Sequence, residues 1–250
     1  MEGLFVPKWI MSLSEQQRIA GNTLSRSRKT SPLGEERKKF ILVAAEYEFD
    51  QCSYGGARMQ RVADRAGVPK SNVHYYFGSK RALYNVVLED VINLWDRTFE
   101  TLDSEDDPEL LLTRFVRKKV EFTRLYPRKT RIFISEMLHG APYLSPSLNE
   151  QMTQWTRDRA EVIKQWIKLG KISDVDPYHL IFMIWASTQH FAQAEVQIKS
   201  VYGKSSLSKN DYDRQADSLT AMVLRICGLT ENLKSDVNPA ANKIAKELAG

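Results

Sequence analysis

Residues 58–77 read RMQRVADRAGVPKSNVHYYF, and this stretch decides how the N-terminal part of the chain folds. Its two halves each carry apolar residues at helical spacing on one face, and AGVP at 66–69 separates them as a turn. Two short helices joined by such a turn are the layout of a helix-turn-helix. The predicted anchors are Met59, Val62 and Ala63 in the first helix and Val73 and Phe77 in the second.

Polar and aromatic side chains remain on the outer face of the second helix once these anchors are set aside. Asparagine can pair with adenine and lysine with guanine, while serine, histidine and tyrosine can reach base edges or phosphates. Lys80 opens the next predicted helix, whose positive N-terminus would also favour a phosphate. A capped surface helix is the plain alternative, but clustered outward tyrosines bordered by basic residues favour DNA. The predicted DNA-binding residues are Arg58, Lys70, Ser71, Asn72, His74, Tyr75, Tyr76 and Lys80.

The positive charge of the chain is concentrated around this stretch. Residues 26–81 carry twelve basic and six acidic side chains, a net charge of +6, whereas the whole chain of 250 residues carries +5. The remainder therefore sums to −1. Such an asymmetry is expected of a module that binds a polyanion, although a solvated basic face would give the same charge count.

Helical patterns extend along most of the chain, and no segment shows sustained alternation between hairpin turns. An all-α fold is expected: an N-terminal three-helix helix-turn-helix domain followed by a larger helical domain for effector binding and dimerisation. The expected domains are a flexible basic arm at 1–33, the helix-turn-helix domain at 34–82, the helical domain at 83–229 and a loose tail at 230–250. The expected helices are 34–50, 58–65, 70–77, 80–100, 107–125, 128–139, 146–170, 176–201 and 208–227.

Several other classes of protein find no support in the sequence. No GxSxG, P-loop, HExxH or Rossmann glycine motif is present, and the four histidines lack metal-ligand spacing. We therefore expect no catalytic residue, no bound metal and no cofactor. Cys52 and Cys227 are expected to be reduced, packed thiols. No apolar run approaches the roughly 18 residues of a membrane span, and residues 1–21 lack the apolar centre of a signal peptide, so a cytoplasmic protein is expected.

The run from about Glu36 to Val91, especially MQRVADRAGVPKSNVHYYFGSKRALYNVVLEDV, resembles the tetracycline-repressor (TetR) family of bacterial regulators. The resemblance implies a homodimer with an N-terminal DNA-binding domain and a helical C-terminal domain that binds a small effector. Two positions depart from the family pattern. Ala57 stands where a threonine usually supports the next helix, and Pro69 stands where a serine commonly caps the following one. Proline is tolerated in the first turn of a helix, so we expect the fold to survive these departures. Weaker operator binding is their expected effect.

The C-terminal half carries a second resemblance. RLYPRKTRIFISEMLHGAPYL and DPYHLIFMIWASTQHFA are similar to the branch of this family that senses uracil and controls pyrimidine use. That resemblance implies that Trp95, Trp185 and Gln189 line an effector pocket. Their chemistry suits a flat ring with donor and acceptor atoms, and Gln189 lies one helical turn after Trp185. Burial in an ordinary helical core is the alternative for all three residues.

These observations predict a one-component transcriptional regulator that is not an enzyme. A dimer, held by a four-helix bundle of 176–201 and 208–227 from each subunit, would bind a palindromic double-stranded DNA operator. A small ligand, uracil or a related pyrimidine, would alter that binding. The alternatives are a regulator of the same family that responds to an unrelated small molecule, a helical enzyme or an architectural DNA-binding protein. The sequence does not identify the operator or the regulated genes, and it does not decide whether the protein represses or activates them. It also leaves open whether translation starts at Met1 or at Met11.

Overall fold

The computed structural model describes residues 32–98 and 106–229. The chain divides into two compact units, residues 1–37 and 38–250, and of the first only residues 32–37 are described. Most of the expected N-terminal arm, the expected tail at 230–250 and the alternative start at Met11 therefore lie outside the described residues. The domain boundaries remain predictions.

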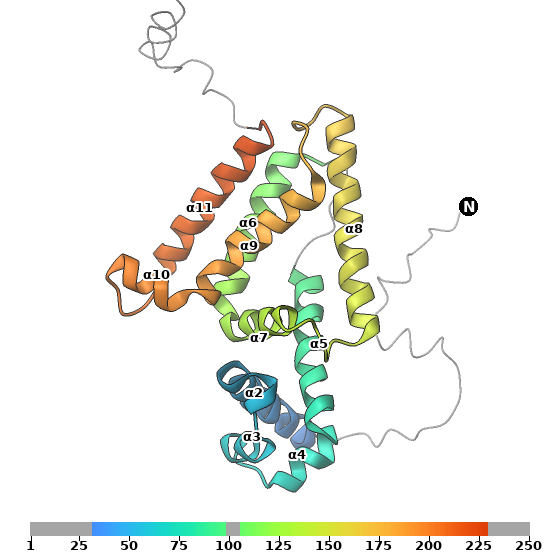
Figure 1. The fold of residues 1–250 in the computed structure, drawn as a ribbon, viewed down its shortest axis with the longest axis vertical. Coiled ribbons are helices and arrows are strands. Elements are labelled where there is room, and N and C mark those ends of the chain that lie inside the picture. The colour runs from blue at the N-terminus through green and yellow to red at the C-terminus, as the bar shows by residue number, and fades with distance from the viewer. Residues whose placement is uncertain (1–31, 99–105, 230–250) are drawn as a thin grey trace, which may run out of the picture. The chain divides into compact units, whose positions relative to one another are not determined.

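The described residues are helical with no strand, which confirms the expected all-α fold (Figure 1). The helices are α2 (Pro32–Gly56), α3 (Met59–Ala66), α4 (Lys70–Phe77), α5 (Lys80–Thr98), α6 (Pro108–Leu125), α7 (Pro127–Leu138), α8 (Pro146–Lys168), α9 (Pro177–Gln193), α10 (Glu195–Tyr202) and α11 (Lys209–Ile226).

Two of the helices expected from the sequence differ from the structure in their bounds. The expected helix 34–50 continues to Gly56 across a kink at Ser53, where φ is 51° and ψ is 179°. The expected single helix 176–201 is two helices, α9 and α10, which meet at Ala194. The break turns α10 so that Ile198 is buried in a small cluster with α6, α9 and α11. Tertiary burial therefore ends α9 at a position where no proline or glycine marks the sequence.

Helix starts in the C-terminal part are explained by local capping. Proline occupies the first helical positions of α6, α8 and α9, and in each the preceding side chain accepts a backbone N–H from the first turn. These caps are Asp107, Ser145 and Asp176. α11 begins with a capping box between Ser208 and Asp211.

The helix-turn-helix packs on its own core. Ile41 and Ala45 of α2, Val62 and Ala63 of α3 and Val73 of α4 are fully or almost fully buried in one cluster with Leu83 and Leu88 of α5. Gly67, with φ of 65°, ends α3 in the left-handed region and allows the turn into α4. The predicted anchors Val62, Ala63 and Val73 are thus core residues, and the anchors Met59 and Phe77 are partly buried against the same cluster.

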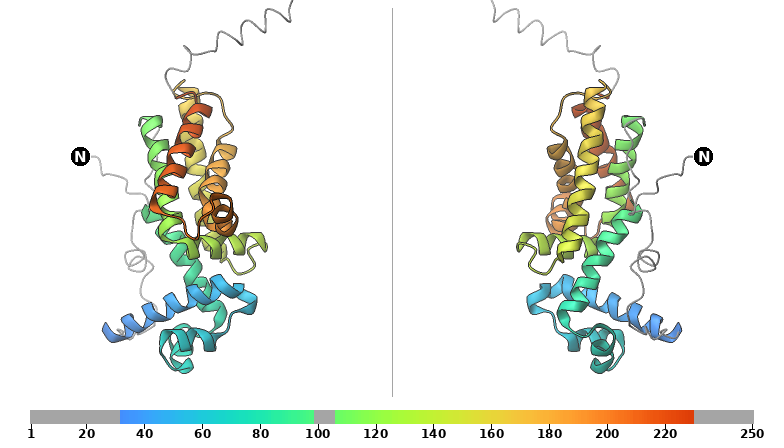
Figure 2. Two further views of the ribbon diagram at one scale, coloured as in Figure 1. Left: turned by 90° about the vertical axis from the view of Figure 1, so that its left-hand side faces the viewer. Right: turned by 90° about the vertical axis from the view of Figure 1, so that its right-hand side faces the viewer.

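A helical bundle follows in the chain. α6 packs on α9 and α11, and α8 packs on α9, so that these helices run side by side (Figure 2). Their core contains Trp166, Ile163, Val116 and Leu112, none more than 2% exposed. α7 contacts α5, α6 and α9, and therefore lies where the helix-turn-helix part and the bundle meet.

Candidate functional site

The outer face of α4 presents the side chains that the sequence predicted for DNA. Lys70, Ser71, His74 and Tyr75 are exposed, while Asn72 and Tyr76 are half-buried. Tyr75 is 69% exposed, a high value for a large aromatic residue, and its ring meets that of Tyr76 edge to face at 5.2 Å between centroids. Arg58 is exposed at the start of α3. The structure thus gathers the α4 residues on one accessible surface, and their role in DNA binding remains a prediction.

The start of α3 is held by a residue from another helix. The backbone N–H of Arg58 donates to Oε1 of Glu48, 3.1 Å away in α2, and Nη1 of Arg61 lies 3.6 Å from the same oxygen. Neither α3 nor α4 has a side-chain cap at its own N-terminus. Glu48, 5% exposed, supplies the acceptor at the start of α3, where Ala57 carries no hydroxyl.

Lys80 and His74 make local contacts that the sequence did not indicate. Nζ of Lys80 donates to the carbonyl oxygen of Gly55 at 3.3 Å and lies 4.5 Å from the ring centroid of Tyr54. Nδ1 of His74 lies 2.9 Å from the carbonyl oxygen of Gly78, so this nitrogen carries the proton and donates. Both side chains hold the ends of helices, and a phosphate contact by either one would add to this local role.

A cavity of about 420 Å³ opens among five helices of the C-terminal part. Its wall is almost entirely apolar and contains the three residues that the sequence predicted for an effector pocket, Trp95 of α5 and Trp185 and Gln189 of α9. The described wall comprises Ile92, Trp95, Lys119, Phe133, Ile134, Met137, Leu138, Met152, Trp155, Trp185, Ala186, Gln189 and Gln193.

Aromatic rings form two walls of this cavity. Trp95 meets Phe133 edge to face with 4.5 Å between centroids, and the rings of Trp155 and Trp185 lie 6.0 Å apart. Nε1 of Trp95 is buried with no hydrogen-bond acceptor among the described residues. Buried indole N–H groups usually find an acceptor, so this wall is suited to a ligand that brings one. Gln189 can both donate and accept.

Lys119 of α6 also lines this cavity and was not predicted from the sequence. Among the residues of the wall that were not predicted, it has the largest chemical consequence. It is 3% exposed, and its Nζ lies 4.9 Å from the ring centroid of Trp95 and 6.0 Å from that of Trp185. Burial lowers the pKa of its ammonium to about 7. A signal was available: Lys119 follows Phe115 and Val116 at helical spacing, so it falls on the buried face of α6.

α7 links the cavity to the helix-turn-helix part. Ile134, Met137 and Leu138 line the cavity, and Glu136 between them is 3% exposed. Oε1 of Glu136 accepts the backbone N–H groups of Tyr143 and Leu144 at 2.7 and 3.0 Å.

The phenol of Tyr84 in α5 also hydrogen-bonds Glu136, and burial together with this carboxylate raises the pKa of Tyr84. The ring centroid of Tyr143, in turn, lies 3.7 Å from that of Tyr54, and Tyr54 also contacts Lys80. A chain of contacts therefore runs from the cavity wall to the start of α5, the helix that follows α4.

Two ion pairs fasten α7 to α2. Arg131 donates to both carboxylate oxygens of Asp50 at 2.7 Å, and Lys129 donates to Glu46 and to Asp90 at 2.5 Å each. Burial alone would lower the pKa of Lys129, but its hydrogen bonds to Asp90 and Glu46 outweigh this and raise it.

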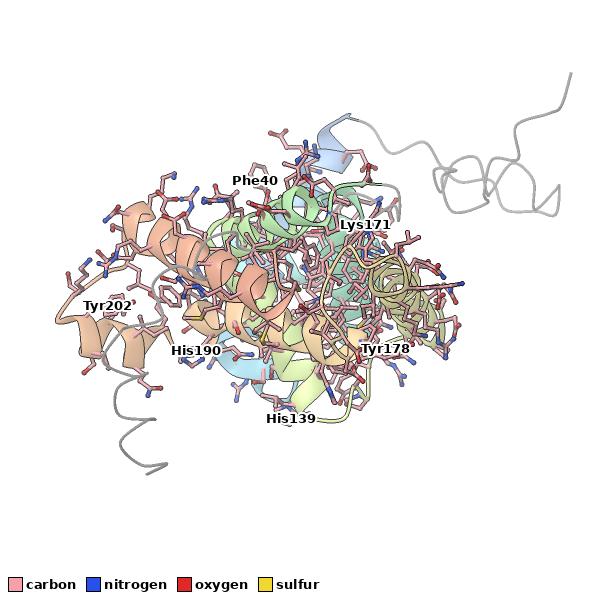
Figure 3. The ribbon with its side chains drawn as sticks, turned by 90° about the horizontal axis from the view of Figure 1, so that it is seen from above. Phe40, His139, Lys171, Tyr178, His190 and Tyr202 are labelled. Carbon is pink, nitrogen blue, oxygen red and sulfur yellow. The ribbon has the colours of Figure 1, made fainter. Side chains whose placement is uncertain are left out.

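The described part of the chain contains neither a candidate metal site nor a candidate membrane-spanning helix. All four histidines are exposed, and two of them, His139 and His190, are labelled in Figure 3. No group of three His, Cys, Asp or Glu residues among 32–98 and 106–229 could hold a metal ion. Within the same residues, no helix has both the length and the apolar character needed to cross a membrane. Cys52 and Cys227 are free thiols, the second fully buried.

Comparison with known proteins defines the class to which this fold and these sites belong. Residues 41–87 match the family described as bacterial regulatory proteins, tetR family, and residues 88–230 match the C-terminal region of YcdC-like proteins. The chain belongs to the TetR family of transcriptional regulators, whose members are not enzymes.

Within that family the chain is similar to the transcriptional regulator RutR of Escherichia coli strain K12, with 36% identity over 202 residues, 81% of this chain and 93% of RutR. It is therefore a RutR-like regulator. Solved structures agree in fold: a transcriptional regulator from Streptomyces coelicolor, SCO4942, has a TM-score of 0.60 at 21% identity and covers 76% of this chain and 97% of its own. AibR, solved with isovaleryl coenzyme A and operator DNA, has a TM-score of 0.58 at 17% identity and covers 74% and 97%.

Proposed function

We propose that this regulator binds a palindromic operator as a homodimer and that a planar ligand, uracil or a related pyrimidine, changes its affinity for that operator. One observation carries the effector assignment: Trp95 of α5 lines a single cavity together with Trp185 and Gln189 of α9. Two tryptophan faces and a side chain that donates and accepts suit a flat ring with mixed polar edges. The similarity to RutR agrees with this choice.

The DNA-binding part of the proposal rests on the accessible surface of α4. We assign Asn72 and Lys70 as base readers in this proposal, and assign as contacts to phosphates or base edges Ser71, His74, Tyr75, Tyr76, Arg58 and Lys80. Because a protein that binds an operator acts where the chromosome lies, we also propose a cytoplasmic location.

The proposed dimer uses a four-helix bundle of α9 and α11 from both subunits. Large apolar side chains are exposed on these helices, namely Phe182 at 48%, Met222 at 54% and Ile226 at 46%. Burial of such residues in an interface is favourable, and a two-fold dimer would fix the spacing of two recognition helices. Half-sites one helical turn apart, about 34–36 Å, are read only when that spacing fits.

Ligand and operator are coupled in this proposal through α7. A ligand that displaces Ile134 or Met137 also displaces Glu136, which holds Tyr84 and the backbone at Tyr143. By linkage, a ligand that weakens operator binding must itself bind less tightly to the operator complex.

A thermal-shift screen of nucleobases tests the effector directly. Uracil at about one hundred times its Kd should stabilise the protein by roughly 2.7 kcal/mol, and Gln189→Leu should abolish the shift while the variant keeps its unliganded melting temperature within a few degrees. Absence of any shift with uracil, thymine and reduced pyrimidines would remove pyrimidines as the effector. The alternative is then an unrelated small molecule, which the size of the cavity also permits: about 420 Å³ equals roughly fourteen water volumes of about 30 Å³, more than a single ring needs.

A further inference from the structure

The described wall of the proposed effector cavity contains one charged side chain, that of Lys119. Among the described residues of the wall, Lys119 alone is ionisable, and Gln189 and Gln193 are the other side chains with strong hydrogen-bonding groups besides the indoles. Lys119 lies on α6, a different helix from the α9 residues that the sequence singled out. Any ligand that lies between Trp95 and Trp185 meets its ammonium, because Nζ lies within 6.0 Å of both ring centroids.

A second buried lysine shows what a purely structural role looks like in this fold. Lys129 is 9% exposed and forms ion pairs with Glu46 and Asp90. Lys119 is more deeply buried, at 3%, and its Nζ faces the rings of Trp95 and Trp185 in the cavity wall. The pKa values follow the surroundings: that of Lys129 is raised, while that of Lys119 is lowered to about 7 by burial.

The donors in this wall point to the chemistry of the ligand. A buried ammonium is stabilised only partly by aromatic faces, and negative charge brought next to it offsets the loss of water. The buried Nε1–H of Trp95 is a second donor of a residue in this wall. A ligand edge with amino groups would place donor against donor, whereas an edge with ionised or strongly polarised oxygens could accept from both groups.

We propose that Lys119 selects effectors that are planar acids, meaning flat rings that present a carboxylate, or an acidic N–H flanked by carbonyl oxygens, to its ammonium. Lys119 is thus a specificity-determining residue of the cavity. The inference rests on the proposal that this cavity is the effector site. It extends that proposal, since it names the charge that the site reads and includes uracil as one member of a wider class.

Matched ligand pairs test this selection. Benzoate and benzamide share a shape and differ in charge, and uracil and cytosine differ in whether a carbonyl oxygen or an amino group occupies one ring position. Isothermal titration at pH 7 should show that the wild-type protein binds the acidic member of a pair about tenfold or more tightly, the size expected for one charge-assisted hydrogen bond.

The variant Lys119→Met keeps a similar length and removes the charge. Since it replaces a buried ion by an apolar side chain, it should fold at least as stably, which its thermal melt checks. In Lys119→Met the preference within each pair should disappear. The control Gln189→Leu should lose affinity for uracil yet keep the preference for benzoate over benzamide.

The outcomes separate this inference from the effector assignment. Wild-type protein that ignores uracil but prefers benzoate, with the preference lost in Lys119→Met, would remove pyrimidines and support the role of Lys119. Uracil that binds equally to wild type and Lys119→Met would keep the effector and overturn the inference. The inference is also overturned if the wild type prefers neither acid, or if the preferences survive in the variant.

Discussion

In the proposed function, single residues on α4 determine which DNA sequence the protein binds. Val73 is buried and fixes the rotation of the helix, so that the residues on either side of it, Asn72 and His74, flank the outward face. Tyr75, with most of its side chain exposed, is oriented for a backbone or base-edge contact rather than for the core. Lys80 has a structural role in addition, because it joins Gly55 and Tyr54 to the start of α5.

Replacing Asn72 by Ala should cost roughly 1–3 kcal/mol at a selected operator and relax the base preference at one position of each half-site. Lys80→Ala should instead weaken binding to all sequences and reduce the salt slope by about one unit. Selection of bound sequences from random DNA, followed by titration at several salt concentrations, measures both effects. If Asn72→Ala weakened every sequence equally, its assignment as a base reader would be wrong.

The buried ammonium of Lys119 should make stability depend on pH. Its pKa is about 7 in the folded protein and near its ordinary value of 10.5 in the unfolded chain. Between these values the unfolded state binds one more proton, so stability rises with pH, by at most about 1.4 kcal/mol per pH unit from this group.

Denaturant titrations of the wild type and Lys119→Met between pH 7 and 10 measure the difference. The stability advantage of Lys119→Met should be greatest at pH 7 and below and should shrink as the pH rises. An advantage that stays constant across this range would show that Lys119 has an ordinary pKa in the folded protein.

At the scale of helices, the sequence predicted most of what was needed to place the sites. Gly67 and Gly78 around α4, Pro127 after α6 and Gly170 after α8 gave bounds that agree with the structure within a few residues, because these signals are local. The break at Ala194 was missed since its cause is not local: Ile198 of α10 is buried against α6 and α11. No feature of residues 190–198 alone indicates it.

The residues of the cavity wall also divide into those whose proximity follows from local helical spacing and those brought together by the packing of separate helices. Trp185 and Gln189 share one face of α9, so their proximity followed from helical spacing. Lys119, Trp155, Phe133 and Met152 reach the same cavity from three other helices, and which helices surround α9 depends on how the bundle packs. The family resemblance supplied Trp95, Trp185 and Gln189, and only packing shows the other residues of the wall.

The connection through α7 predicts that sensing and DNA binding can be separated. Glu136→Gln keeps the size of the side chain but weakens its bonds to Tyr84 and to the backbone of Tyr143 and Leu144, since a neutral amide is a weaker acceptor than a carboxylate. We expect ligand affinity within about threefold of wild type and a smaller effect of ligand on operator affinity, because coupling energies of about 1–3 kcal/mol depend on few contacts. Ligand titrations with and without operator DNA give both quantities. A full response in Glu136→Gln would place the coupling elsewhere.

At the scale of the whole molecule, the proposed coupling of ligand binding and DNA binding requires a dimer. The exposed Phe182 belongs to α9, which also forms part of the cavity wall, and the exposed Met222 belongs to α11, which contributes to the bundle core. Dimerisation through these helices would therefore place the ligand near the interface and the reading helices at a fixed distance. The wide distribution of these residues along the chain explains why no short motif signals the dimer.

The double substitution Phe182→Glu and Met222→Glu should convert the dimer to a monomer, because it would bury like charges in an apolar interface. Light scattering measures the mass, and circular dichroism confirms that the helices remain. Operator affinity should fall by at least a hundredfold, since one helix-turn-helix unit then binds one half-site. A variant that stays dimeric would place the interface on other helices.

The most direct test of the account is the affinity of the purified full-length dimer for its selected operator, measured with and without saturating uracil. Linkage between the cavity and α4 predicts a change of about fivefold or more, with an equal change in uracil affinity when operator is present. Identical operator affinities in the two titrations, with uracil shown to occupy the cavity, would contradict the proposed coupling of ligand and DNA.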